Sequence, residues 1–475
     1  MRPLFLFFMV ESETSDSDSL LSLGNRRCSL TTEVFAPRDL FFGDSGKGTI
    51  VDTLVRKYGA HAVMREGGPQ AGHGVVTSDG RYHIFAQIGS ATFVPGVTTF
   101  LSRDMLVDPW RLMMEVQQLV RLGVTDVYER LAISANAYVI SPLHAAANRL
   151  RERARGDGRH GSCGLGIGET MSDVNLHPHV VLRVSDLNTV RHLYERLCLI
   201  QHFKREQLHA EGVLTACWNQ PDAQDDIDLL LETSRLLPYI VALDEFNARV
   251  RIVRDSYLGE LLEKGSIVAE HSQSVLLDQW RGFDPYTTWR ICTTDSLEAL
   301  LAEQGFTGPV HHIGVVRGYG VRHGPGPFPT EDATLTRLLP DPPSARNEWQ
   351  GQFRVGHFDA VLVRYAINCC ERMDSLVVTC LDRMSVMDDW RVCTHYKEGD
   401  SLVRDLPLGP YKDLEYQRVL TKRLFKMQPS LETSTRAMDF KTRVQEHIAC
   451  IESELNIPVS ILSFGPTAED KRFLS

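Results

Sequence analysis

Short segments rich in valine and isoleucine alternate with longer amphipathic segments along this chain, and the alternation limits the folds that it can adopt. The short segments predict strands at 62–64, 136–140, 248–253, 266–269, 376–379 and 458–463. The amphipathic segments predict helices at 48–57, 108–122, 141–155, 186–201, 226–236, 296–303, 357–370 and 435–454. This order favours an α/β fold with a large, mainly parallel central sheet flanked by helices. Such a sheet is expected to hold ligands in loops at the carboxyl ends of its strands.

Composition narrows the class of protein. The chain has 475 residues, and its 51 Lys and Arg against 61 Asp and Glu give a net charge of −10. We therefore expect a large buried core, and no binding to nucleic acid or to an anionic membrane. The ten cysteines form no Cys-x-x-Cys pair. Scattered cysteines are typical of a reducing compartment, so we expect a cytoplasmic protein without a structural metal site.

The N-terminal segment differs from the rest of the chain. Residues 3–10 (PLFLFFMV) are apolar, and an acidic, serine-rich run follows them. The apolar run is too short to span a bilayer, and the acidic run does not fit a secretory or mitochondrial signal. We expect residues 1–31 to be a disordered extension and residues 32–475 to form one domain.

The most distinctive motif is Phe41–Thr49 (FFGDSGKGT), in which a glycine-rich turn leads directly into an amphipathic helix. Glycines let backbone N–H groups converge on a phosphate, the helix N-terminus favours negative charge, and Lys47 can neutralise it. The common phosphate-binding loop G-x-x-x-x-G-K-[ST] is absent, because Phe41 stands at its first position and Gly48 follows the lysine. Taken alone, the segment is also compatible with a plain turn.

Six further motifs follow in order. They read EGGPQAGHG at 66–74, GSCGLGIG at 161–168, QSVLLD at 273–278, GPGPFPTE at 324–331, TCLD at 379–382 and SFGP at 463–466. Together with the first motif they resemble the adenylosuccinate synthetase family across nearly all of residues 40–470. The resemblance implies a homodimeric α/β enzyme whose catalytic domain spans 32–475. Members of that family use GTP and Mg²⁺ to join the amine of aspartate to C6 of inosine monophosphate (IMP).

The implied chemistry needs three kinds of group. Phosphorylation of the purine O6 makes phosphate the leaving group, and the step requires a base for the N1 proton, a cationic cradle and a hydrogen-bond donor. By resemblance, Asp44 is that base and also a magnesium ligand, together with the carbonyl of Gly72. Lys47 would offset phosphate charge, and His73 would donate to O6. The alternatives are an Asp44 that only caps the helix, a solvated Lys47 and a structural His73.

The resemblance also assigns residues to two nucleotide pockets. Residues expected to bind GTP are Gly43, Ser45, Gly46, Gly48, Gly74, Asp382, Ser463 and Gly465. Residues expected to bind a purine nucleoside monophosphate or the amino-acid amine donor are Gln70, Ser162, Cys163, Gln273, Thr288, Arg322 and Arg354. Asp382 would select guanine by accepting hydrogen bonds from its N1 and N2.

The chain departs from the family at several positions. Cys163 and Cys380 replace a phosphate-binding threonine and a base-covering lysine. Residues 174–179 lack an arginine that the family sends into the neighbouring subunit, and 347–359 is shorter than the family's aspartate-binding loop. The amine donor is therefore left open. Two other interpretations remain: a specialised or phage-type relative acting on another purine nucleotide, and a non-catalytic GTP-binding homologue. The intact set of Asp44, Lys47, Gly72 and His73 favours the ligase.

Overall fold

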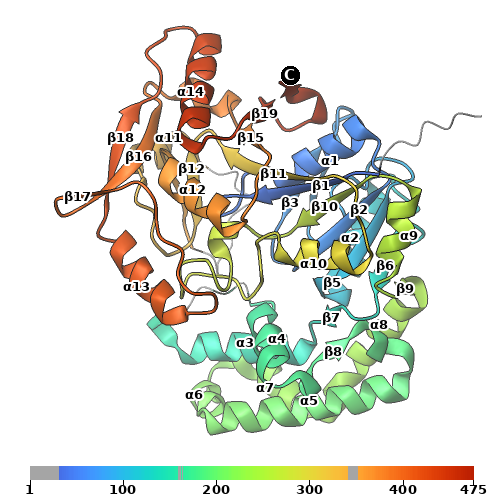
Figure 1. The fold of residues 1–475 in the computed structure, drawn as a ribbon. Helices are drawn as coiled ribbons and strands as arrows, with labels where there is room; N and C mark the ends of the chain where they lie inside the picture. Colours follow the sequence, from blue (N-terminus) through green and yellow to red (C-terminus); the bar gives the residue numbers. More distant parts are fainter. Residues whose placement is uncertain (1–31, 159–161, 163, 341–350, 475) are drawn as a thin grey trace, which may run out of the picture. The chain divides into compact units, whose positions relative to one another are not determined.

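The computed structural model describes residues 32–158, 162, 164–340 and 351–474, and its centre is a long twisted sheet (Figure 1). The strand order is β20-β19-β15-β11-β1-β10-β2-β5-β6-β9. These strands are β1 (Val34–Asp39), β2 (Ala62–Gly67), β5 (Thr98–Val107), β6 (Leu131–Ser134), β9 (Arg251–Val253), β10 (Ile267–His271), β11 (Val310–Arg317), β15 (Ser375–Thr379), β19 (Val459–Ser463) and β20 (Lys471–Phe473). All neighbours in this order are parallel except β19 and β20. The predicted α/β class with a mainly parallel sheet is confirmed.

Alternate residues of the central strands point to opposite faces, as expected for strands that are buried on both sides. Val34 of β1 packs with α9 (Tyr257–Lys264) and α10 (Asp295–Glu303) on one face. Its neighbour Phe35 packs on the other face with α1 (Lys47–Tyr58). Helix α1 is therefore held against the sheet, and its first turn lies beside the end of β1.

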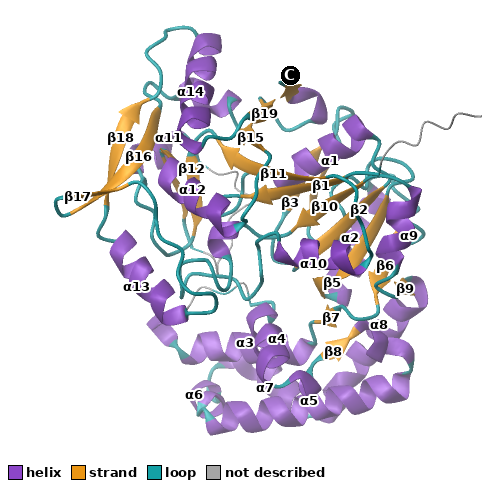
Figure 2. Cartoon of the chain, viewed as in Figure 1, coloured by secondary structure: helices purple, strands orange, loops and turns teal. Residues whose placement is uncertain are grey.

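A group of helices lies in the chain between β5 and β9 (Figure 2). These are α2 (Pro109–Arg121), α3 (Pro142–Ala154), α4 (Ile167–Leu176), α5 (Val190–Ala210), α6 (Val213–Cys217), α7 (Gln224–Leu231) and α8 (Leu237–Arg249). All of them except α4 contribute to one apolar cluster, and α3 contacts α4, α5, α6 and α7. Two short strands, β7 (Tyr138–Val139) and β8 (Leu182–Arg183), join this group to β5.

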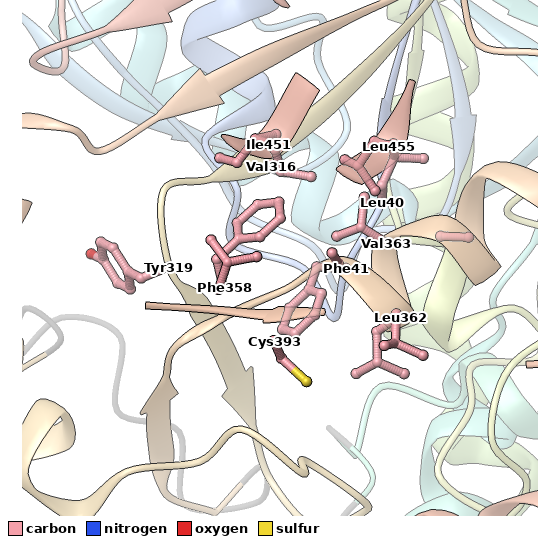
Figure 3. Close-up of a cluster of buried hydrophobic side chains, with 14 of the residues drawn as sticks. Leu40, Phe41, Val316, Tyr319, Phe358, Leu362, Val363, Cys393, Ile451 and Leu455 are labelled. Atoms are coloured by element: carbon pink, nitrogen blue, oxygen red, sulfur yellow. The ribbon is translucent and has the colours of Figure 1, made fainter. Parts of the chain in front are cut away.

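The C-terminal part adds a second sheet and three helices. Strands β14 (Phe358–Asp359), β16 (Arg391–Glu398), β17 (Ser401–Val403) and β18 (Gln428–Thr433) form the sheet, and α12 (Ala360–Cys369), α13 (Leu414–Leu424) and α14 (Phe440–Leu455) accompany it. Their apolar cluster includes Leu40 and Phe41 from the loop after β1 (Figure 3). Burial of these two residues anchors the loop immediately before Gly43.

Two antiparallel strand pairs and one short α-helix remain. The elements are β3 (His73–Val76) with β4 (Tyr82–Phe85), β12 (Gly320–His323) with β13 (Phe353–Gly356), and α11 (Ala333–Leu338). Contacts group residues 31–475 into one unit. The expected disordered extension at 1–31 lies outside the described residues. Within the described ranges, no helix combines the length and apolar character needed to cross a bilayer.

Candidate functional site

A cleft of about 1450 Å³ lies at the carboxyl edge of the central sheet. Its walls come from the ends of six parallel strands or from the loops that follow them. Ser45 follows β1, Gln70 follows β2, Ser272 follows β10, Arg317 ends β11, Thr379 ends β15 and Ser463 ends β19. This is the edge at which an open parallel sheet is expected to hold its ligands.

The loop between β1 and α1 is held by the carboxylate of Asp39. That carboxylate accepts hydrogen bonds from the backbone N–H groups of Phe41 and Ser45, each at 3.0 Å. Gly43, Asp44 and Gly46 all have positive φ, at 98°, 60° and 81°. Asp44 is not a glycine, so this conformation costs about 1–2 kcal/mol. A side chain held at such a cost in a cleft is typical of a functional site.

Helix α1 presents an uncapped N-terminus to the cleft. Its N-cap residue, Gly46, provides no side-chain hydrogen bond, so the first N–H groups of the helix keep their capacity to bind an anion. Lys47 is buried in the same turn, and its Nζ donates to the carbonyl of Gln273 at 3.1 Å. The pKa of Lys47 is lowered by burial, and the nearby carboxylates of Asp39 and Glu270 only partly oppose this shift. The turn thus combines backbone donors with a positive charge.

His73 begins β3 and is enclosed by charged groups. Its Nδ1 lies 2.5 Å from Oε1 of Glu270 and 2.9 Å from Nη1 of Arg65, and its Nε2 lies 3.2 Å from the carbonyl of Ser272. Burial lowers the pKa of His73 to about 4, although the hydrogen bond with Glu270 opposes the change. The imidazole is therefore neutral near pH 7, with its proton on one of the two nitrogens.

Asp44 and His323 face each other in the cleft. His323 ends β12, and its Nε2 lies 3.4 Å from Oδ2 of Asp44. The side chain of Asp44 is 41% exposed, so a ligand in the cleft can reach it. Arg317 donates from Nε to the carbonyl of Asp44 at 2.5 Å. Sequence reasoning missed His323 and Arg317, although His323 stands directly before the GPGPFPTE motif.

The residues predicted for the monophosphate lie at one end of this cleft. Gln70 donates from Nε2 to Oγ1 of Thr288 at 3.3 Å, and Ser162 exchanges hydrogen bonds with the amide of Asn148. The side-chain amide nitrogen of Gln273 is buried and has no hydrogen-bond partner among the described residues. Such a donor calls for an acceptor from a ligand or from water. The predicted Cys163 lies outside the described residues.

Two predicted arginines are engaged with the turn 324–327. Arg322 donates to the carbonyls of Pro325 and Pro327, and burial lowers its pKa to about 9. Arg354 donates to the carbonyls of Gly324 and Gly326 and pairs with Glu331 at 2.7 Å. Arg322 still lines the cleft, whereas Arg354 does not. In this structure, backbone carbonyls and a carboxylate occupy the guanidinium of Arg354, and its role in binding substrate stays a prediction.

The opposite end of the cleft contains Asp382, Ser463 and Gly465. Ser463 donates from Oγ to the carbonyl of Gly465 at 3.2 Å. Lys471 of β20 donates to the carbonyls of Gly465 and Thr467 at 2.7 and 2.6 Å. Burial lowers the pKa of Lys471 to about 8. Sequence reasoning missed this lysine, because the pairing of β20 with β19 brings it to the loop.

The cleft thus brings together most of the residues predicted from sequence. Those in its lining are Gly43, Asp44, Ser45, Gly46, Lys47, Gly48, Gln70, Gly72, His73, Gly74, Ser162, Gln273, Thr288, Arg322, Asp382, Ser463 and Gly465. They come from segments separated by up to several hundred positions. An open cavity with two glycine-rich loops, a buried lysine and an exposed carboxylate can bind a polyphosphate and transfer protons beside it.

The chain is similar to known proteins over most of its length. A family model described as "Adenylosuccinate synthetase" matches residues 39–472. The adenylosuccinate synthetase of Microcystis aeruginosa is 28% identical over 437 residues, covering 90% of this chain and 91% of the relative. That of Alkalilimnicola ehrlichii is 29% identical over 450 residues, covering 90% and 95%.

Two solved structures share the fold. The fully ligated adenylosuccinate synthetase of Plasmodium falciparum has a TM-score of 0.72 at 19% identity, covering 93% of this chain and 100% of that one. The succinoaminodeoxyadenylate synthetase of cyanophage S-2L, bound to dGMP and to dATP as an energy donor, has a TM-score of 0.57 at 17% identity, covering 93% and 95%.

Proposed function

The chain belongs to the adenylosuccinate synthetase family, and we propose that it is a GTP- and Mg²⁺-dependent C–N ligase of purine biosynthesis. In this proposal it phosphorylates O6 of an IMP-like purine monophosphate and displaces the phosphate with an amino-acid amine. The observation that carries the proposal is the common cleft, in which Asp44, Lys47 and His73 line one cavity beside the N-terminus of α1.

Asp44 is suited to remove the N1 proton of the purine. Its carboxylate is partly exposed in the cleft, and the imidazole of His323 lies on one side of it. Removal of this proton increases the negative charge on O6, which then attacks the terminal phosphoryl group of GTP. A positioned base of this kind contributes about 10²–10⁴ to a rate.

His73 is suited to donate a hydrogen bond at O6 or at the transferring phosphoryl oxygen. When its proton is on Nε2, the carbonyl of Ser272 accepts it, and a substrate oxygen can take the place of that carbonyl. In this tautomer Nδ1 accepts a hydrogen bond from Nη1 of Arg65, and Glu270, which pairs with Arg65, holds that guanidinium beside the ring. Lys47 and the first N–H groups of α1 would hold the phosphoryl oxygens.

The donor set also fits Mg²⁺. The described residues include no cluster of three or more histidine, cysteine or carboxylate side chains that could hold a metal ion by themselves. Mg²⁺ usually binds through one or two carboxylates, waters and substrate phosphates, and it takes hard oxygen ligands. Asp44 and the carbonyl of Gly72, both in the lining, would hold it. When bound, the ion neutralises charge on the phosphates.

The remaining assignments follow the two ends of the cleft. Asp382, Ser463 and Gly465 would bind the guanine, and a carboxylate there favours GTP over ATP. Gln70, Ser162, Gln273 and Thr288 would bind the monophosphate. The amine donor is aspartate or another amino acid. The homodimer implied by the resemblance is part of the proposal and is testable by the mass of the protein in solution.

The proposal is tested by an activity assay in which the amino acid is omitted or varied. The protein is incubated with GTP, Mg²⁺ and IMP, with and without each of the twenty amino acids, and phosphate release and product mass are measured. Release that depends on one amino acid identifies the donor. Asp44→Asn should abolish turnover. Asp79→Asn is the control and should leave turnover unchanged, because the Asp79 side chain is exposed and lies outside the cleft lining. Turnover that survives Asp44→Asn would contradict the proposal.

Parallel reactions distinguish the other interpretations. Turnover of GMP in place of IMP, or of ATP in place of GTP, would indicate a phage-type activity. Binding of GTP without any turnover would indicate a non-catalytic homologue.

A further inference from the structure

Trp289 is an exposed aromatic side chain inside the cleft. It lines the cavity directly after Thr288, and 44% of the residue is exposed. A large apolar ring that stays exposed within a ligand cleft is a common contact point for a ligand. No motif singled out from the sequence includes it.

The segment that carries Trp289 runs along α4. On the cleft side, a Cβ added to Gly168 would lie 3.3 Å from Cδ1 and 3.5 Å from Nε1 of the indole. On the buried side, Nη1 of Arg290 lies 3.2 Å from Sδ of Met171. The edge of the indole that carries its N–H group therefore lies over the first turn of α4.

Several donors meet at this turn. The N-cap residue of α4 is Gly166, which provides no side-chain cap, so the first N–H groups of the helix keep their capacity to bind an anion. The hydroxyls of Ser162 and Thr288 also line this end of the cleft. The indole N–H has no acceptor in the part of the chain that the structure describes, and the ring edge around it is electropositive.

The carboxylates at this end are already paired. Glu169 contacts Arg151 and Lys204, and Glu211 contacts Arg151 at 2.7 Å. Glu152 contacts Arg155. Their charges are therefore offset, and the α4 terminus remains available to an anion.

We propose that Trp289 binds the phosphate end of the purine nucleoside monophosphate. The indole N–H donates to a phosphate oxygen, and the ring covers the α4 N-terminus and excludes water from it. This role deepens the proposed function and rests on it, since a monophosphate must occupy this end of the cleft.

The experiment compares Trp289→Phe with the wild type. Phenylalanine retains an aromatic ring and lacks the N–H donor. Trp218→Phe is the matched control, because Trp218 is 54% exposed and lies outside the cleft lining. Dissociation constants for IMP and for inosine are measured by calorimetry, and tryptophan fluorescence is recorded in the same titrations.

We expect Trp289→Phe to weaken IMP binding about ten- to a hundredfold, the effect of one hydrogen bond to a charged acceptor. Inosine, which lacks phosphate, should bind both proteins equally. IMP should change the fluorescence of the wild type and of Trp218→Phe, and most of this change should be lost in Trp289→Phe. Two results would overturn this inference and leave the proposed function standing: an unchanged affinity of Trp289→Phe for IMP, or an equal loss of affinity for IMP and for inosine. A wild type that binds no purine monophosphate would overturn the proposed function as well.

Discussion

His73 and Glu270 are 197 positions apart in the sequence, yet Nδ1 of the first lies 2.5 Å from Oε1 of the second. The carboxylate also pairs with Arg65 at 2.6 Å and accepts hydrogen bonds from Ser90. Burial raises the pKa of Glu270, but Arg65 and His73 lower it to about 2, so the group is a carboxylate at neutral pH. The orientation of the imidazole therefore depends on a charge from a different strand.

Glu270→Gln should reduce turnover and stability together. The substitution leaves the guanidinium of Arg65 buried without its carboxylate, and removal of one partner of a buried ion pair costs about 3 kcal/mol in the free energy of unfolding. We expect kcat to fall at least tenfold, because the plane of the His73 ring is no longer fixed. Urea denaturation and initial rates measure the two effects.

Glu303→Gln is the control for this variant, since Glu303 pairs with Arg103 at the surface. It should leave the rate unchanged and alter stability by less than about 1 kcal/mol. A Glu270→Gln protein with wild-type kcat would show that the contact with His73 has no catalytic role.

Gly48→Ala tests the close approach of α1 to His73. A Cβ at this position would lie 2.8 Å from Cβ of His73 and 3.0 Å from its carbonyl carbon. We expect kcat to fall about ten- to a hundredfold, because a displacement of the order of 1 Å at a catalytic group costs that much. Gly158→Ala, where the added Cβ meets no atom of the described residues within 4 Å, is the control. Equal activity of the two variants would contradict the expected displacement of His73.

Lys471→Met tests the loop at the proposed guanine end. The ammonium group holds the carbonyls of Gly465 and Thr467, so its loss should loosen the loop. Hydrogen bonds from a charged donor contribute about 1.5–3 kcal/mol, and we expect the KM for GTP to rise about tenfold with little change in kcat. Lys397→Met is the control, because Lys397 is an exposed lysine of β16. A fall in kcat at unchanged KM would place Lys471 in a different role.

A buried histidine makes stability depend on pH. His447 of α14 contacts the hydroxyl of Ser434 through Nδ1 and the carbonyl of Gly318 through Nε2. Burial lowers its pKa from 6.5 to about 4. Between these values the unfolded chain binds a proton that the folded protein does not, so the free energy of unfolding falls as the pH decreases from about 6.5 to about 4.

The expected loss from this one group is about 3 kcal/mol. His447→Gln should therefore lose less stability than the wild type over the same pH interval, as measured by denaturant unfolding. The same pH dependence in both proteins would show that His447 does not titrate in this way.

The sequence predicted the elements with regular patterns and missed those whose stability depends on distant partners. The helices predicted at 48–57, 108–122 and 296–303 correspond to α1, α2 and α10 within one residue at each end. Strand β1 was not predicted, because its second half reads Pro37-Arg38-Asp39. Arg38 is accommodated in the buried sheet by an ion pair with Glu66 of β2 at 2.8 Å, which no local pattern reveals.

In the candidate site, too, residues within local motifs were predicted and residues that depend on distant partners were missed. Seven motifs in the order of the family identified the loops that line the cleft. Glu270, His323 and Lys471 were missed, since strand pairing and loop packing bring each of them to its partner. Arg354 was predicted from its match to an arginine of the family's loop, and its engagement with the turn 324–327 could not be predicted from the sequence.

Isotope transfer from the purine tests the central claim most directly. IMP labelled with ¹⁸O at C6 is incubated with the protein, GTP, Mg²⁺ and the amine donor, and the released phosphate is examined by mass spectrometry. If O6 is phosphorylated and then displaced, the label appears in phosphate, one atom for each C–N bond formed. Product formation with unlabelled phosphate would contradict the account.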